Sequence, residues 1–203
     1  MRMQARGDAE LWQAGCTALE EDWRRLADEE RRWIRARLAR IGALQERLQA
    51  LFAAADGAAH CRLCRGACCD RGKYHVTLAN LLALLAAGQA PPPFDAAAPC
   101  PMLDGEACRL GAAQRPFNCV TFVCGPVEDA LGAAGAAEFY SCEKALRAVY
   151  EDFARRYAGG GMNGFLLAAA RLAGRSPLAR QDVAPAGLRG LLPPARVGVS
   201  EEG

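Results

Sequence analysis

The sequence predicts a mainly α-helical protein, in which a long N-terminal helix and a helical C-terminal part surround a loop-rich cysteine domain. Three observations predict this fold class. Apolar residues recur every three or four positions near both ends of the chain, which is the period of an amphipathic helix. Runs of β-branched residues are short, and glycine and proline are frequent, so few strands are expected. Eight of the ten cysteines lie between residues 61 and 124.

The first predicted segment, residues 1–56, is an amphipathic helix. Its apolar positions follow helical spacing, and they are Trp12, Cys16, Leu19, Trp23, Leu26, Trp33, Ile41, Leu44, Leu48 and Leu51. Acidic and basic residues are interleaved along the segment, which argues against a nucleic-acid partner. The apolar stripe either binds a protein partner or a second copy of the chain, as in a coiled coil, or packs on the rest of this chain.

The second predicted segment, residues 57–158, is the cysteine-cluster domain. Gly57 is expected to end the first helix, and the cysteines begin directly after it. Thr77 can cap a short helix near 77–87. A second clear helix, with an apolar face, is expected near 136–157. The chain between these helices is expected to form loops.

The third predicted segment, residues 159–203, contains a short helix and a disordered tail. The helix is expected from about Asn163 to Leu172, after the run GGGMNG, which lacks the spacing of a nucleotide-binding loop and indicates a flexible joint. Beyond Gly174 the prolines are scattered and large apolar residues are few, a pattern typical of disorder.

The chain contains no apolar run of the ~18 residues needed to span a bilayer, and its first residues lack the apolar stretch of a secretion signal. These observations predict a cytoplasmic protein with no membrane partner. Thiols stay reduced in that compartment, so a cysteine-rich segment is more typical of metal ligands or redox groups than of disulfides. The net charge of +2 indicates no strongly anionic partner.

Eight cysteines form two groups with different spacings. They are Cys61, Cys64, Cys68 and Cys69, followed by Cys100, Cys108, Cys119 and Cys124. A CxxC turn, such as that of Cys61 and Cys64, lets two sulfurs reach one ion. Side chains of adjacent residues diverge, so Cys68 and Cys69 suit different ions or a shared multinuclear cluster. Eight thiolates fit two tetrahedral zinc sites, a binuclear site with bridging sulfurs, or an iron–sulfur cluster.

Three further residues are candidate ligands. His60 and His75 could complete a mixed Cys/His site, although solvated or hydrogen-bonded histidine is the more usual role. Cys142 lies on the apolar face of the predicted 136–157 helix and is either a distant thiolate ligand or a core residue. No pair of nucleophile and base with a third orienting residue is visible, so no catalytic residue is assigned.

The cysteine-rich segment resembles a known family. The cluster that begins at Cys61, followed by TLANLLALL, CPML and RPFNCVTFVC, is similar to the zinc- or iron-chelating CxxCxxCC cysteine-cluster family, also called YkgJ-like. The resemblance covers about residues 60–126. It implies a metal-binding protein in which all eight cysteines are ligands, with Arg115 and Pro116 as the RP element.

Two positions depart from that family's pattern. Three residues rather than two separate Cys64 from the adjacent cysteine pair, which changes the geometry expected of the first group. Asn80 stands where the family often has an acidic residue, which restricts the expected role of its helix to packing.

The sequence thus predicts a metal-ion-binding protein that chelates Zn²⁺ or iron through a cysteine cluster. An iron–sulfur redox protein is one alternative. A component of a protein-modifying methyltransferase is another, because the cysteine portion is similar to that of a flagellin lysine methylase. In the metal-binding interpretation the thiolates close loops that lack regular structure, so loss of metal should unfold residues 60–126.

Overall fold

A computed structural model describes most of the 203-residue chain, namely residues 2–64, 72–95, 100, 102–104 and 107–181. The described residues are mainly α-helical, as predicted. Their α-helices are α1 (Arg2–Arg25), α2 (Asp28–Ala54), α3 (Gly57–Cys64), α4 (Leu78–Ala86), α5 (Phe117–Thr121), α6 (Gly125–Arg156) and α7 (Phe165–Leu172). Two short strands, β1 (Leu103–Asp104) and β2 (Ala107–Cys108), form an antiparallel pair.

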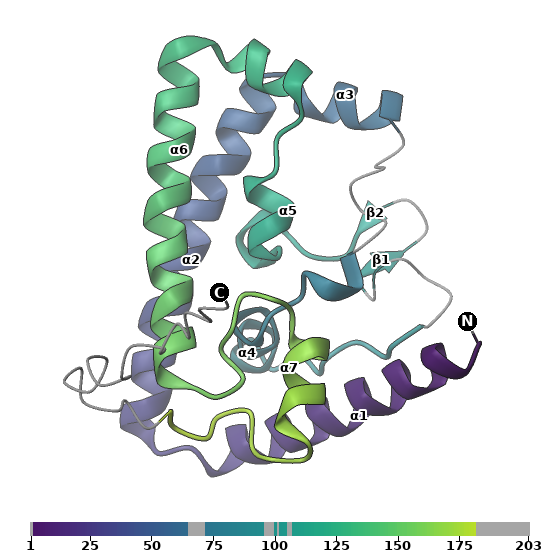
Figure 1. Cartoon of the computed structure of the whole chain (residues 1–203). Helices are drawn as coiled ribbons and strands as arrows, with labels where there is room; N and C mark the ends of the chain where they lie inside the picture. Colours follow the sequence, from purple (N-terminus) through teal and green to yellow (C-terminus); the bar gives the residue numbers. More distant parts are fainter. Residues whose placement is uncertain (1, 65–71, 96–99, 101, 105–106, 182–203) are drawn as a thin grey trace, which may run out of the picture.

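Two long antiparallel helices, α2 and α6, lie side by side and form the frame of the molecule (Figure 1). Helix α1 lies across one end of this pair, and α7 packs along α1. Helices α4 and α5 and the β-hairpin occupy the angle between α1 and the helical pair. None of the described helices is both long enough and apolar enough to cross a bilayer.

The N-terminal segment is two helices rather than the single helix predicted. The chain is extended at Ala27, with φ −63° and ψ 151°, and α2 starts at the next residue. The first turn of α2 contains the acidic residues Asp28–Glu30, whose charges stabilise the N-terminus of a helix through its dipole. The apolar period continues through the break, so periodicity alone does not reveal it, whereas the acidic run does.

The apolar stripe of the N-terminal segment packs on the rest of this chain. Trp12 is 1% exposed, and its indole Nε1 donates a hydrogen bond of 3.0 Å to the carbonyl of Pro92. The same ring meets Phe165 of α7 edge to face. In α2, Ile34 and Leu48 are buried against the core that all the longer helices share. Of the two alternatives, packing on the rest of the chain therefore applies to Trp12, Ile34 and Leu48. These side chains are buried and not exposed to a partner.

The predicted helix near 77–87 is confirmed as α4, but two other boundaries differ. Gly57 begins α3, where the sequence predicted only the end of a helix. Helix α6 begins at Gly125, well before residue 136, and contains an interruption at Gly132, with φ 64° and ψ 176°. The first part of α6 is rich in alanine, which favours helix but produces no strong apolar stripe. The chain predicted to be loops also contains α5 and the β-hairpin.

The chain after α7 packs against the helices up to Gln181. Arg180 forms an antiparallel bridge with Tyr157, and the amide of Ala158 donates to the carbonyl of Ala179 at 2.8 Å. The side chain of Ser176 donates to Asp22 of α1. The prediction of disorder from Gly174 onward is therefore wrong for these residues, while residues 182–203 lie outside the described part.

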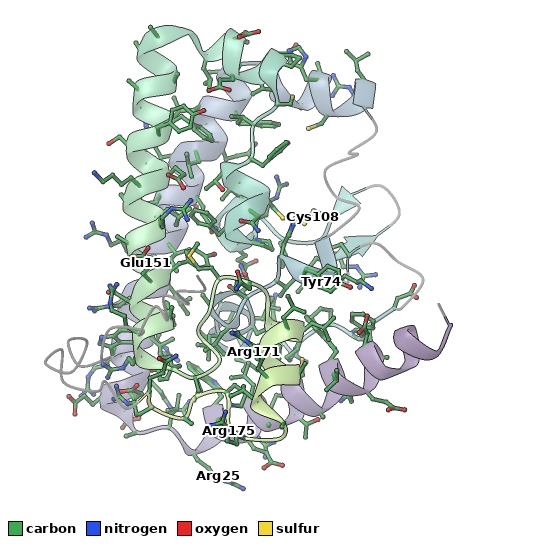
Figure 2. All side chains as sticks on the ribbon, viewed as in Figure 1. Arg25, Tyr74, Cys108, Glu151, Arg171 and Arg175 are labelled. Atoms are coloured by element: carbon green, nitrogen blue, oxygen red, sulfur yellow. The ribbon has the colours of Figure 1, made fainter. Side chains whose placement is uncertain are left out.

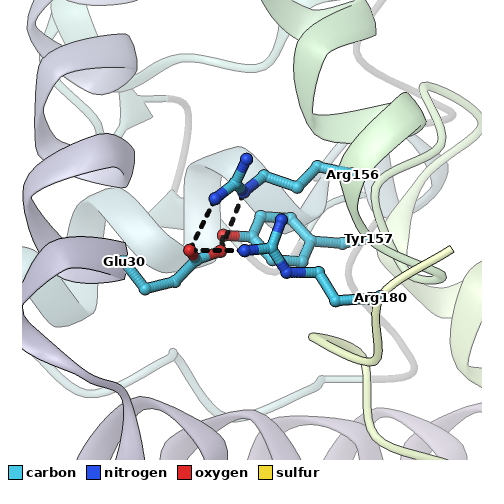
Figure 3. A network of polar contacts seen from close by, with 4 residues as sticks. All are labelled: Glu30, Arg156, Tyr157 and Arg180. Atoms are coloured by element: carbon cyan, nitrogen blue, oxygen red, sulfur yellow. Dashed lines mark hydrogen bonds and ion pairs between the residues drawn. The ribbon is translucent and has the colours of Figure 1, made fainter.

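A cluster around Glu30 joins the start of α2 to the end of α6 and to the last described residues (Figure 3). The Glu30 carboxylate accepts hydrogen bonds from Arg156 at 2.6 and 2.8 Å, from Arg180 at 2.8 Å, and from the Tyr157 hydroxyl. The Arg156 hydrogen bond is the largest cause that lowers the pKa of Glu30 to about 2. This cluster therefore links the start of α2 to the end of α6 and to the chain that follows α7.

Candidate metal centre

Short elements position the second cysteine group. Cys108 ends β2, where it pairs with Leu103, and its side chain is exposed. Cys119 lies in the five-residue helix α5, which follows Pro116, and the Cys119 amide donates to the Pro116 carbonyl at 2.9 Å. The proline has φ −56°, which suits the residue at the start of a helix. The RP element thus orients Cys119 through its backbone.

The fold brings together two of the candidate ligands, Cys119 and His75. The Cys119 sulfur lies 3.6 Å from His75 Nδ1, although 44 residues separate them in the chain. Cys119 is exposed and His75 is half-buried. Two ligands on a tetrahedral zinc ion, with Zn–S of about 2.3 Å and Zn–N of about 2.0 Å, are separated by about 3.6 Å. The pair therefore fits two corners of such a site.

Burial lowers the pKa of His75 below its ordinary value. The imidazole is then neutral at neutral pH, which is the form that binds metals. The same 3.6 Å separation also suits a weak hydrogen bond between a thiol and an imidazole. The pair can accordingly act either as two ligands or as a hydrogen-bonded nucleophile and base.

Gly72, which follows the first cysteine group in the chain, lies directly against Cys100. Cys100 is 8% exposed, and its sulfur accepts a hydrogen bond of 3.4 Å from the Met102 amide. A Cβ atom added to Gly72 would lie 2.5 Å from the Cys100 Cβ and 2.8 Å from its sulfur, so only glycine fits here. Residues 72–75 therefore contact two cysteines of the second group, Cys100 at one end and Cys119 at the other.

Cys61 and Cys124 lie on a different pair of elements. Cys61 is part of α3, and Cys124 is the residue before α6, where its carbonyl accepts the amides of Val127 and Glu128. Helix α3 packs against α6. Figure 1 shows this contact at the start of α6, beyond α5 and the hairpin. In Figure 2, Cys108 and Tyr74 lie instead on the side that holds α5 and the hairpin.

The described part of the chain contains no group of three or more Cys, His, Asp or Glu side chains arranged to hold a metal. In this part, His75 and Cys119 are brought together as a pair. The side chain of Cys64, and all of Cys68 and Cys69, lie outside the described residues. His60 on α3 and Cys142 on α6 likewise belong to no such group. Burial chiefly raises the pKa of the Cys142 thiol, which suits a packing role.

A buried polar cluster, which the sequence did not predict, holds the chain in front of α5. The Asn80 side chain accepts a hydrogen bond from the Thr77 amide at 2.9 Å and donates to the Gln114 carbonyl at 2.9 Å. Gln45 of α2 donates to the Arg115 carbonyl at 2.6 Å and lies 3.3 Å from the Tyr150 hydroxyl. Asn80 therefore does more than pack, and the signal for it was a polar residue at a core position of an otherwise apolar helix.

The Arg115 side chain supports the same segment. Its guanidinium donates to the carbonyl of Leu110 and to the side chain of Gln49, each at 3.3 Å. These contacts join the end of the hairpin to α2. They hold the chain that leads into α5 and Cys119.

Comparisons with models of protein families, with curated proteins and with solved structures find no match to this chain. The resemblance of residues 60–126 to the cysteine-cluster family stays a prediction. The arrangement of His75, Cys100 and Cys119 is consequently the basis on which a function can be argued.

Proposed function

We propose that this protein binds zinc or iron at a centre in which His75 and Cys119 are ligands together with cysteines of the first group. The observation that carries the proposal is the separation of 3.6 Å between the Cys119 sulfur and His75 Nδ1. Thiolate and imidazole are the donors that zinc and iron sites in proteins use. The resemblance to the cysteine-cluster family supports the same conclusion.

The connection to the first group follows from chain length. Cys69 precedes Gly72 by three positions, and three residues of chain span at most about 11 Å. Gly72 itself touches Cys100, and His75 faces Cys119. An ion bound by His75 and Cys119 can therefore recruit thiolates from the adjacent pair, with one sulfur on this ion and its neighbour on a second.

The short elements around the second group also favour a metal. Each strand of the hairpin has two residues, and α5 has five. Strands and helices of these lengths are not stable on their own in water. Ligand bonds would supply this missing stability, because the free energy of binding a structural metal is also free energy of folding.

Metal analysis together with a visible spectrum, on full-length protein purified without oxygen, tests the proposal. Zinc-bound thiolates are colourless, whereas iron–sulfur centres absorb visible light. The substitutions Cys119→Ser and Cys68→Ser should each reduce the bound metal. Cys142→Ser is the matched control, since it makes the same chemical change on α6, at a thiol whose pKa is raised chiefly by burial, as expected of a packing role.

Each outcome has a distinct meaning. Stoichiometric zinc without colour supports a metal-binding module that folds on its ion. Iron with sulfide and a broad visible band supports the iron–sulfur alternative at the same cysteines. Protein without metal, in which Cys119 reacts rapidly with iodoacetamide, would replace the metal centre with an activated thiol.

A further inference from the structure

The start of α7 contacts the backbone on both sides of His75. A Cβ atom added to Gly164 would lie 2.1 Å from the carbonyl oxygen of Tyr74 and 2.7 Å from its carbonyl carbon. The next amide, that of Phe165, donates a hydrogen bond of 2.6 Å to the carbonyl of Val76. Gly164 also has φ 88°, a conformation that side chains disfavour. Any other residue at this position would push away the chain that carries His75.

Helix α7 is itself held firmly by the core. Phe165 is 0% exposed and packs against Trp12 of α1. At Gly15 of α1, an added Cβ atom would lie 3.0 Å from both the Phe165 ring and the Ala169 side chain. The space between Gly15 and α7 does not admit even a methyl group without a shift of its neighbours, so the start of α7 has little room to move toward α1. A change at Gly164 must therefore displace residues 74–76 instead.

We infer that Gly164 is a positioning residue of the metal centre, which places His75 Nδ1 opposite the Cys119 sulfur and so makes His75 a ligand. This role rests on the proposed function and adds a structural determinant remote from the cysteines. It also changes the meaning of the GGGMNG run. Its last residue, Gly164, is a point of close packing between α7 and the candidate site, where the sequence predicted a flexible joint.

Three alanine substitutions in this one run separate positioning from stability. Gly164→Ala should move the backbone at Tyr74 and withdraw His75 from the ion. Gly160→Ala meets the carbonyl of Phe153 at 2.0 Å, in α6, so it should destabilise the fold without a direct effect on His75. Gly161→Ala meets only the Arg171 side chain, at 3.4 Å, and should change neither property.

Nitrogen NMR of the imidazole side chains in zinc-loaded protein reads the ligand directly. The chain has two histidines, so His60→Gln leaves His75 as the single source of signal. In the His60→Gln background, the protein with its native glycines and the Gly161→Ala variant should both show a metal-bound Nδ1. Gly164→Ala should lose that signal and bind zinc about 10- to 100-fold more weakly in a chelator competition, the usual cost of disturbing the groups that orient a ligand. Gly160→Ala should melt at lower temperature but retain the metal-bound signal.

Amide hydrogen exchange of the wild-type protein provides a test that does not depend on the folding of any variant. Linkage is reciprocal, so zinc bound by His75 should slow exchange of the Phe165 amide. The Gly160 amide, which donates to the Tyr157 carbonyl in the same run, is the internal control and should change less.

The outcomes distinguish the two proposals. Retention of the metal-bound His75 signal and of wild-type zinc affinity in Gly164→Ala would overturn the role of Gly164 alone. An unchanged Phe165 exchange rate on zinc binding would do the same. Wild-type protein that shows no metal-bound imidazole in the presence of zinc would overturn the proposed ligand and the positioning role together.

Discussion

Removing the charge of Glu30 should destabilise the fold at neutral pH and reduce its sensitivity to acid. The side chain is 13% exposed and accepts hydrogen bonds from Arg156, Arg180 and Tyr157. The pKa of its carboxyl is about 2 in the folded chain, compared with 4.5 for an ordinary glutamate. Each pKa unit corresponds to about 1.4 kcal/mol, so the full difference is about 3 kcal/mol. Solvent reaches part of the cluster, since Arg180 is 56% exposed, and the expected loss in Glu30→Gln is about 1–2 kcal/mol.

The pH dependence follows from the direction of the shift. Because folding lowers the pKa of Glu30, the stabilisation is complete above pH 4.5 and disappears as the pH falls toward about 2. Urea unfolding at pH 7 should show the loss in Glu30→Gln, and at pH 2 the variant and wild type should nearly coincide. Glu151→Gln is the control, because Glu151 is 47% exposed and forms an ion pair with Arg155 on the same helix. Equal free energies of unfolding for Glu30→Gln and wild type at pH 7 would refute the reasoning.

Four further predictions concern the core and the candidate site. Ile34→Ala should lower the free energy of unfolding by about 2–5 kcal/mol, because Ile34 is 0% exposed; a loss below about 1 kcal/mol in urea unfolding would contradict this burial. Asn80→Ala should cost about 1–3 kcal/mol by leaving the Gln114 carbonyl without its partner, and a wild-type melting temperature would argue against the buried cluster. Gly72→Ala should weaken zinc binding, because its added methyl overlaps Cys100, and unchanged affinity in a chelator competition would contradict that contact. Removing metal with a chelator should raise the amide exchange of residues 107–124 while α2 and α6 stay protected, and uniform exchange would contradict a locally stabilised centre.

The parts of the fold that the sequence predicts are those with a strong apolar period. In α4, Leu78, Leu81 and Leu82 are each 0% exposed, as their spacing indicates. The break at Ala27 does not interrupt the apolar spacing, and the acidic run that follows it is the feature of the sequence that indicates a helix start there. The early part of α6 also lacks a strong apolar period, since the alanine and glycine residues there form helix without a marked apolar face.

The sequence indicates which residues belong to the candidate site, but not how these residues are arranged in space. His75 and Cys119 both stand out by residue type, yet nothing local indicates that they face each other. Their positions depend on contacts from distant segments, namely Gly164 on one side and Gln45 on the other. Glycine positions of this kind look like flexible joints in a sequence, because the absence of a side chain serves close packing and flexibility equally well.

X-ray absorption at the metal edge of the metal-loaded, full-length protein tests the proposed centre most directly. The centre described here predicts a mixed first shell, with sulfur at about 2.3 Å and nitrogen at about 2.0 Å from zinc. The nitrogen contribution should disappear in His75→Gln. A shell of light atoms without sulfur, or a wild-type spectrum that His75→Gln leaves unchanged, would contradict a centre built on His75 and Cys119.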